Sequence, residues 1–321
     1  MIEIIEMSIL QSKSGFKQMK LFRLSKTDLN EVEQIPFKLE KNIQDLVEKN
    51  TESVFNLKFI QSELSVDKYR IDTLCFDEEN NSFVIVEYKK GSSYSVIDQG
   101  YTYLQLLLNN KSDFLLVLSQ YFNKVLKMED IDWSQSRIIF VSPSFNSYQK
   151  DSVNFKDLPF ELWEIKRYSN DTIVLNQHKS DSKESIETLN KSNSVISQVT
   201  REVKVYSEDK HLGHGSNEIN EIYFKIKERV LDLGSDVEIV PRKEYIGFKR
   251  GSNFVDIEFQ KKQLKIYINM KFGSIPDPMN ISRDVSKIGH YGNGEYEIKV
   301  NGETDLDYLM LMIKQSYNSK D

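Results

Sequence analysis

Residues 69–88 form the part of the sequence that most constrains the fold. Two apolar segments, "YRIDTLCFD" and "SFVIVEY", flank a polar stretch, "EENN", that suits a tight turn. A turn centred there pairs Phe76 with Phe83 and Asp72 with Glu87. Side chains that are directly opposed on antiparallel strands point to one face, with Cβ atoms ~5 Å apart. The sequence therefore predicts an antiparallel hairpin with two carboxylates side by side on one face.

A lysine follows the pair, since Lys89 lies two residues beyond Glu87 and shares its face by the period of two in a strand. Opposed like charges destabilise a sheet, and a divalent cation between Asp72 and Glu87 would relieve the repulsion. Mg²⁺ accepts carboxylate oxygens together with water and phosphate. It can polarise a phosphoryl oxygen and activate water, while Lys89 orients that water or stabilises developing charge. The alternative is an ordinary surface hairpin whose charged face is solvated.

Helices are predicted on both sides of the hairpin. Apolar residues recur at helical spacing in residues 38–50, and serines precede a second apolar stripe that begins near residue 96. On this second helix Gln99 and Tyr103 are four residues apart and share a face, either beside the carboxylates or in packing. A second Glu-x-Lys pair, Glu164 and Lys166, lacks an opposed aspartate and a following helix of this kind.

Together, Asp72, "EYK" at 87–89 and the Gln99–Tyr103 pair resemble the restriction-endonuclease-like PD-(D/E)xK superfamily over residues 35–145. The resemblance implies an α/β fold with an αβββαβ core around a central mixed sheet. It also implies that Glu40, on the first helix, approaches the metal. From the residues alone, Glu40 is an ordinary glutamate at the edge of an apolar stripe. Ile71 stands where the superfamily pattern has proline.

The function that the resemblance implies is a metal-dependent nuclease that hydrolyses DNA phosphodiester bonds with Mg²⁺ or Mn²⁺. Its implied metal ligands are Asp72, Glu87 and Glu40. Its implied catalytic residues are Asp72, Glu87, Lys89, Glu40 and Gln99. Lys90 and Tyr103 are assigned to nucleic-acid contacts. A non-catalytic nucleic-acid or protein interaction module on the same fold is the alternative.

The remaining pattern of the first half indicates alternating helices and strands. We expect buried strands at 113–119 and 136–144, a short helix near 120–128 between them, and closing strands at 160–168 and 171–176. The length of 321 residues suits two domains. The sequence predicts a nuclease-like domain at 1–176, a polar linker at 177–204, and a smaller α+β domain at 205–321.

The second half contains a locally basic segment, residues 241–271. It has eight Lys or Arg against three acids in a chain of net charge −6, with aromatic residues between them. Such a composition fits a surface for phosphate contacts and base stacking. The predicted nucleic-acid contacts are Arg242, Lys243, Lys249 and Arg250. A strand set with a solvated lysine face explains the composition equally well.

A glycine-rich stretch, "GHYGNGEYEIKV", follows and contains His290. This histidine is either a ligand, an acid–base group, or a loop residue held by hydrogen bonds to the backbone. With "PRKEYIGFK" and "DLDYLMLMIKQSY", it resembles a bacterial C-terminal domain of unknown function found in chains labelled "predicted transport protein". The sequence gives the transport label no support, because no apolar run approaches the ~18 residues of a membrane span.

The single cysteine, Cys75, excludes an intramolecular disulfide, and the first 20 residues make a poor signal peptide. These features predict a cytoplasmic protein with DNA as its partner and no membrane partner. Homodimerisation stays open.

Overall fold

The structure is a computed structural model. It describes residues 20–90, 95–155, 157–180, 182 and 194–320. In the first part of the chain the strands are β1 (Leu21–Ser25), β2 (Asp28–Val32), β3 (Gln34–Ile35), β4 (Lys58–Val66), β5 (Tyr69–Asp77), β6 (Ser82–Tyr88), β7 (Arg137–Ser142), β8 (Phe160–Tyr168) and β9 (Ile173–His178). The helices there are α2 (Glu40–Glu48), α3 (Thr51–Phe55), α4 (Val96–Asn109), α5 (Lys111–Tyr121), α6 (Ser147–Ser152) and α7 (Ser194–Glu202), with 3₁₀ turns at Met128–Asp130 and Trp133–Gln135.

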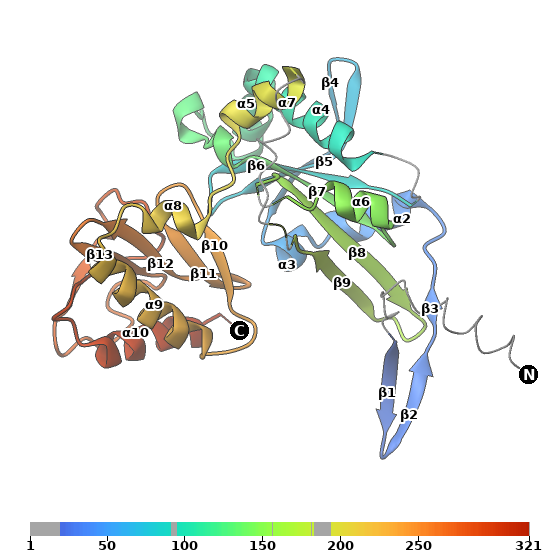
Figure 1. The fold of residues 1–321 in the computed structure, drawn as a ribbon. Coiled ribbons are helices and arrows are strands. Elements are labelled where there is room, and N and C mark those ends of the chain that lie inside the picture. Colours follow the sequence, from blue (N-terminus) through green and yellow to red (C-terminus); the bar gives the residue numbers. More distant parts are fainter. Residues whose placement is uncertain (1–19, 91–94, 156, 181, 183–193, 321) are drawn as a thin grey trace, which may run out of the picture.

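The first part is built on a seven-stranded mixed sheet in the order β3-β8-β7-β6-β5-β4, with β9 also paired to β8 (Figure 1). Strands β6, β7 and β8 are parallel, while β5 pairs antiparallel with β6 and with β4. The predicted hairpin register is observed, because Phe76 pairs with Phe83 and Leu74 with Ile85. The predicted mixed α/β architecture is confirmed.

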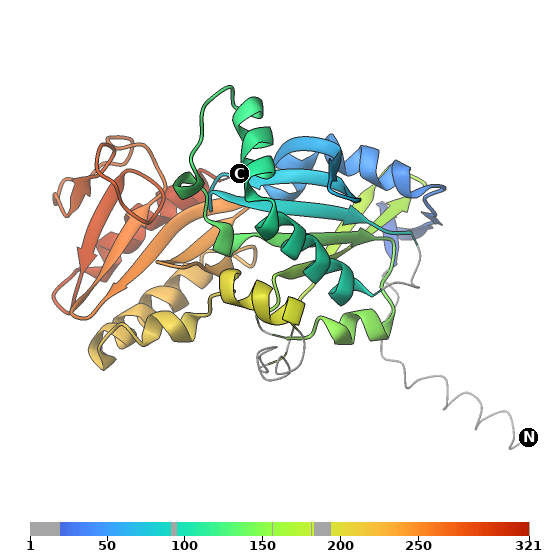
Figure 2. The ribbon, with the colours of Figure 1, turned by 90° about the horizontal axis from the view of Figure 1, so that it is seen from above.

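Helices cover both faces of this sheet, as Figures 1 and 2 show. Helices α4, α5 and α7 pack on one face through residues that include Leu104, Phe114 and Val199. Helix α2 packs on the other face through Ile43 and Val47, and Phe55 of α3 lies against the same cluster. Because β6 alternates between the two clusters, Phe83 and Ile85 face α4, whereas Val84 and Val86 face α2.

The prediction of a strand at 113–119 is wrong, since this segment lies in helix α5. Only Phe114 and Leu118 are buried, one helical turn apart, and Leu116 is 57% exposed. A short apolar run has no period that separates a buried strand from a helix. The residues predicted to form a helix near 120–128 contain only the end of α5 and the start of the first 3₁₀ turn.

Part of the predicted linker, 177–204, belongs to the first half of the structure. Strand β9 continues to His178, and α7 buries Val199 in the same cluster as α4 and α5. The segment is polar except for a short apolar stripe of valine and isoleucine at 195, 196, 199 and 203. Its average composition therefore predicted a linker.

The second half forms a six-stranded sheet in the order β10-β11-β12-β13-β15-β14, in which neighbouring strands pair antiparallel. Its strands are β10 (Glu238–Pro241), β11 (Ile246–Arg250), β12 (Ser252–Gln260), β13 (Gln263–Ile268), β14 (Ser282–Asp284) and β15 (Tyr296–Val300). Its helices are α8 (Glu208–Leu212), α9 (Asn217–Leu231) and α10 (Leu306–Asn318). Helices α9 and α10 pack against the sheet around a core of their own (Figure 1).

The two halves meet at the turn of the β5–β6 hairpin. The carboxylate of Glu79 accepts a hydrogen bond of 3.1 Å from the N–H of Asn253 in β12. The β5–β6 turn therefore points toward the second sheet, while the opposite end of the hairpin carries Asp72 and Glu87. In the described ranges, no helix is both long enough and apolar enough to cross a bilayer.

Candidate functional site

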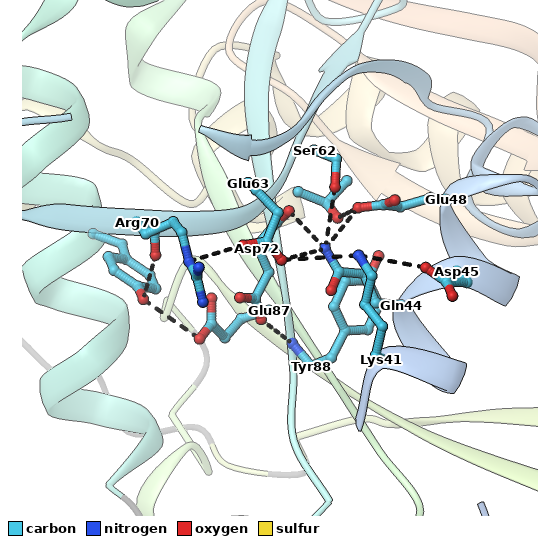
Figure 3. Close-up of polar contacts among 12 residues, drawn as sticks. Lys41, Gln44, Asp45, Glu48, Ser62, Glu63, Arg70, Asp72, Glu87 and Tyr88 are labelled. Carbon is cyan, nitrogen blue, oxygen red and sulfur yellow. Dashed lines mark hydrogen bonds and ion pairs between the residues drawn. The ribbon is translucent and has the colours of Figure 1, made fainter. Parts of the chain in front are cut away.

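The candidate site lies where β5 begins and β6 ends. Thr73 pairs with Val86, so the next residues along these antiparallel strands, Asp72 and Glu87, share the face that α4 covers. The N–H of Tyr88 donates a hydrogen bond of 3.0 Å to Oδ2 of Asp72. Figure 3 shows the two carboxyl side chains next to each other across the strands. The structure thus brings both predicted carboxylates together.

Three side chains contact one oxygen of Glu87. Its Oε1 accepts hydrogen bonds from Lys89 Nζ at 2.6 Å and from Gln99 Nε2 at 2.8 Å, and the hydroxyl of Tyr103 lies 3.4 Å away. The N-cap Ser95 accepts a bond from the N–H of Asp98, so the first turn of α4, which carries Gln99, is held in place. Lys89, Gln99 and Tyr103 therefore meet at this carboxylate, as predicted from their spacing.

The other oxygen of Glu87 has no hydrogen-bond partner among the residues that the structure describes, although Glu87 is only 2% exposed. Burial raises the pKa of Glu87 to about 7, and the negative charge of Asp72 raises it further. Burial also raises the pKa of Asp72, against the effect of the Tyr88 hydrogen bond and of Lys89. Two buried carboxyl groups so close together favour a shared proton or a bound cation.

Helix α2 supplies a second polar group that was not predicted. The Gln44 amide nitrogen lies 3.0 Å from the carbonyl oxygen of Asp72, 2.9 Å from Glu48 and 3.2 Å from Glu63 (Figure 3). Glu48 accepts a bond of 2.6 Å from the Thr73 hydroxyl. These contacts hold β5 at the carbonyl group of Asp72 and at the next residue, Thr73.

Glu63 is a further acidic residue near the pair, since its charge, after that of Glu40, contributes to the raised pKa of Asp72. It lies in β4 with a φ of 55°, a left-handed conformation that is costly for a glutamate and often found at functional sites. Arg70 holds it through an ion pair of 2.8 Å. Sequence reasoning missed Glu63 because β4 was not predicted.

Glu40 begins α2, and its carboxylate accepts a hydrogen bond of 2.8 Å from the N–H of Lys90, just past the end of β6. The Lys90 ammonium binds the carbonyl oxygen of Lys38. Among the described residues, no group of three or more His, Cys, Asp or Glu side chains is placed to hold a metal ion. Asp72 and Glu87 provide two carboxylates with one unbonded oxygen, which fits a divalent ion that takes its remaining ligands from water and phosphate.

The basic residues of the second half lie elsewhere. Arg242 and Lys243 line a cavity of about 400 Å³ with the turn residues Glu79 to Asn81. That turn follows Asp77, the last residue of β5, which is five residues and roughly 17 Å along the strand from Asp72. The structure therefore does not bring these two residues to the carboxylate pair.

Lys249 and Arg250 end strand β11. Arg250 pairs with Asp236 at 2.7 Å, and its guanidinium lies 4.7 Å from the ring centre of Tyr317. This arginine is held within the second half of the protein. Lys249 is half-buried and faces the larger cleft described below.

Glu164 and Lys166, the second Glu-x-Lys pair, lie on β8. Glu164 is opposite Ser142 and Asn176 on the neighbouring strands, so neither partner is an aspartate. Glu164 pairs with Lys150 at 2.8 Å and lies 3.8 Å from Lys166. This pair serves as an internal comparison for Glu87 and Lys89.

The glycine-rich loop holds a buried carboxylate in the second half. Asp256 accepts hydrogen bonds from the N–H and the side-chain amide of Asn293, at 2.6 and 3.0 Å, and from Asn253 at 2.8 Å. His290 lies between two backbone carbonyl oxygens, of Ile288 and Gly294, and stacks on Tyr267. Among the alternatives for His290, the contacts match a loop histidine held by backbone.

Comparison with known proteins gives one family match and one long relative. A family model described as "Domain of unknown function (DUF5655)" matches residues 207–320. An "Uncharacterized protein" of Haemophilus influenzae is 45% identical over 299 residues, which cover 93% of this chain and 99% of that protein. The structure titled "Structure of EndoMS-dsDNA2 complex" is 17% identical, with a TM-score of 0.21, over 44% of this chain and 50% of that chain.

The predicted resemblance of the second half to a domain of unknown function is thus confirmed, and the transport label remains without support. The chain belongs to the same family as the uncharacterized Haemophilus influenzae protein, and its residues 207–320 match the DUF5655 model.

Proposed function

We propose that the protein is a nuclease that hydrolyses DNA phosphodiester bonds at Asp72 and Glu87 with a divalent cation. One observation carries the proposal: Glu87 is buried beside Asp72 with an oxygen that has no hydrogen-bond partner in the described part of the chain. Two adjacent carboxyl groups destabilise each other. A cation relieves this cost, and the unbonded oxygen is available to bind it.

Each neighbouring residue would then have a defined role. Bound Mg²⁺ or Mn²⁺ would supply charge stabilisation at the phosphoryl oxygen and a water of lowered pKa. Gln99 and Tyr103 hold Oε1 of Glu87, so that Oε2 keeps one orientation. Lys89 has only 20% of its side chain exposed and lies beside Glu87, where its ammonium can orient water or stabilise charge on the phosphate.

A second candidate is a nucleic-acid or protein interaction module that keeps the site without turnover. The ion pair between Lys89 and Glu87 favours it, because at 2.6 Å the ammonium already balances one carboxylate without a metal. The carboxylate of Glu40 likewise has a partner in the N–H of Lys90. In this case Asp72 and Glu87 would share a proton at neutral pH.

The test is a cleavage assay on linear, branched and single-stranded DNA with Mg²⁺, Mn²⁺ or EDTA. Wild-type protein should cut at least one substrate with a metal and none with EDTA, and Asp72→Asn should be inactive. Glu164→Gln, which changes the comparison glutamate on β8, should cut like wild type. If wild type binds DNA and leaves every substrate intact, the non-catalytic module is the function.

A further inference from the structure

A cleft of about 1330 Å³ lies between the two sheets, away from the carboxylate pair. On one side it is bounded by α3, by the first residues of β7 and β8, and by the end of β9. On the other side it is bounded by β10, by the turn between β11 and β12, and by Ser319 and Lys320. The ion pair between Lys179 and Glu238, at 3.4 Å, connects the two sides.

The wall from the first half carries several aromatic side chains together with the carboxylates of Glu52 and Glu161. Phe55, Phe155, Phe160 and Trp163 all line the cleft. The ring centres of Phe55 and Trp163 are 5.2 Å apart, edge to face, and the Trp163 indole N–H donates to Glu161 at 2.9 Å. Trp163 is half-buried, so part of its ring is accessible.

The wall from the second half is cationic. It contributes Arg242, Lys249, Arg250 and Lys320, against Asp236 and Glu238. Arg250 is paired with Asp236. Within the described ranges, the side chains of Arg242 and Lys249 form no hydrogen bond or ion pair.

The negative charges of Asp77 and Glu79 act on Arg242, but among the described residues neither carboxylate forms an ion pair with it. Arg137 bridges Asp77 and Glu161, with 2.8 Å in each ion pair. Arg242 lies close enough to Arg137 for their repulsion to lower the pKa of Arg242, after burial as the larger cause. Like charges this close favour an anion beside them.

We propose that this cleft binds a short stretch of single-stranded nucleic acid, with phosphates on Arg242 and Lys249 and a base against the aromatic wall at Trp163. Basic side chains next to accessible aromatic rings are the usual surface for single strands. The cleft is also larger than the ~300–1,000 Å³ of small-molecule sites, which favours several linked nucleotides over one. The site does not require Asp72 and Glu87 to be catalytic.

The test measures binding to the full chain in EDTA, so that cleavage cannot interfere. Fluorescein-labelled oligo(dT) is titrated and followed by anisotropy, and the emission of Trp163 is followed in a Trp133→Phe background with unlabelled oligo(dT). The binding variant is Arg242→Gln with Lys249→Glu. The control is Lys262→Glu, an exposed lysine beyond the far end of β12, roughly 27 Å along the strand from the cleft.

We expect the double variant to bind at least about tenfold more weakly than the control. The slope of log K against log salt concentration should be smaller in magnitude by roughly 1.4, or ~0.7 for each lost phosphate contact. Trp163 emission should change on binding, and Glu164→Gln should bind like wild type. A single variant, Lys249→Glu, covers the case in which Arg242→Gln does not fold, and it should show about half of the loss in salt dependence.

Three results would overturn the proposal: no binding of oligo(dT) by wild type, equal binding by Lys249→Glu and Lys262→Glu, or binding without a change in Trp163 emission. Thymidine monophosphate that binds as tightly as the oligonucleotide would also overturn it, in favour of a mononucleotide pocket. If oligo(dT) binds in the cleft but the protein cuts no DNA, the nuclease proposal is contradicted and the proposal for the cleft stands.

Discussion

Asp72 accepts a hydrogen bond of 3.0 Å from the backbone N–H of Tyr88, which places its carboxylate across the end of β6 beside Glu87. The bond comes from the backbone, so it fixes Asp72 without using the side chain of a neighbour. Glu87 is held instead by side chains, from Lys89, Gln99 and Tyr103. The two carboxyl groups are therefore positioned independently, one by the strand and one by α4.

Lys89→Ala should reduce DNA cleavage by about 10²–10³-fold, the usual effect of losing one positioned donor near developing charge. Metal binding should persist, because both carboxylates remain. The matched control is Lys166→Ala, which removes the lysine of the Glu164 pair on β8. Single-turnover cleavage compares the two variants, and equal rates for Lys89→Ala and wild type would show that Lys89 has no catalytic role.

Glu87→Gln should make the protein more stable at high pH. The pKa of Glu87 is raised from 4.5 to about 7 in the folded state, so the folded protein binds this proton more tightly than the unfolded chain does. The resulting stability is fully present below about pH 4.5 and is lost as the pH rises through 7. Wild type should thus lose on the order of 2–3 kcal/mol from this group between pH 5 and pH 8.

Urea unfolding across this range, without divalent cations, measures the effect. The glutamine variant should show a flatter pH profile than wild type, with Glu164→Gln as the control of equal chemistry. Superimposable profiles for Glu87→Gln and wild type would mean that Glu87 is not protonated in the fold.

Asp256→Ala should loosen the glycine-rich loop. Three donors, two from Asn293 and one from Asn253, would lose their acceptor at a cost of ~1–3 kcal/mol each. Asp256→Asn should keep the loop ordered, because the amide oxygen of the new asparagine can still accept hydrogen bonds from Asn293. Its amide N–H can donate to Oδ1 of Asn253, which has no partner in the wild type, once the Asn253 amide flips.

Hydrogen exchange of residues 288–294 distinguishes these variants. We expect fast exchange in Asp256→Ala only, with Asp284→Ala, an exposed aspartate on β14, as the control. Unchanged exchange in Asp256→Ala would show that the loop does not depend on this carboxylate.

The hairpin and its carboxylates could be predicted because alternation over residues 69–88 assigns each side chain to a face. A turn centred on residues 78–81 pairs Leu74 with Ile85, which is the observed register, and the same pairing brings Asp72 opposite Glu87. Gln99 and Tyr103 followed from helical spacing on the next element. The local pattern was sufficient for these residues.

Other features depend on packing that no local pattern encodes. Gln44 and Glu63 join the site only because α2 lies against β4 and β5. The segment 113–119 has no period that distinguishes strand from helix, and α5 buries only its Phe114–Leu118 face. Composition grouped Arg242, Lys243, Lys249 and Arg250, but only the position of the second sheet at the β5–β6 turn shows that they lie away from Asp72.

Binding of one Mn²⁺ between Asp72 and Glu87 is the claim on which the nuclease proposal depends. Electron paramagnetic resonance of free Mn²⁺, titrated into full-length protein at pH 8, measures it directly. We expect one bound ion per wild-type chain and per Glu164→Gln chain, and a loss of that ion in both Asp72→Asn and Glu87→Gln. The same stoichiometry and affinity in Asp72→Asn as in wild type would contradict the account, because the ion would then be bound elsewhere.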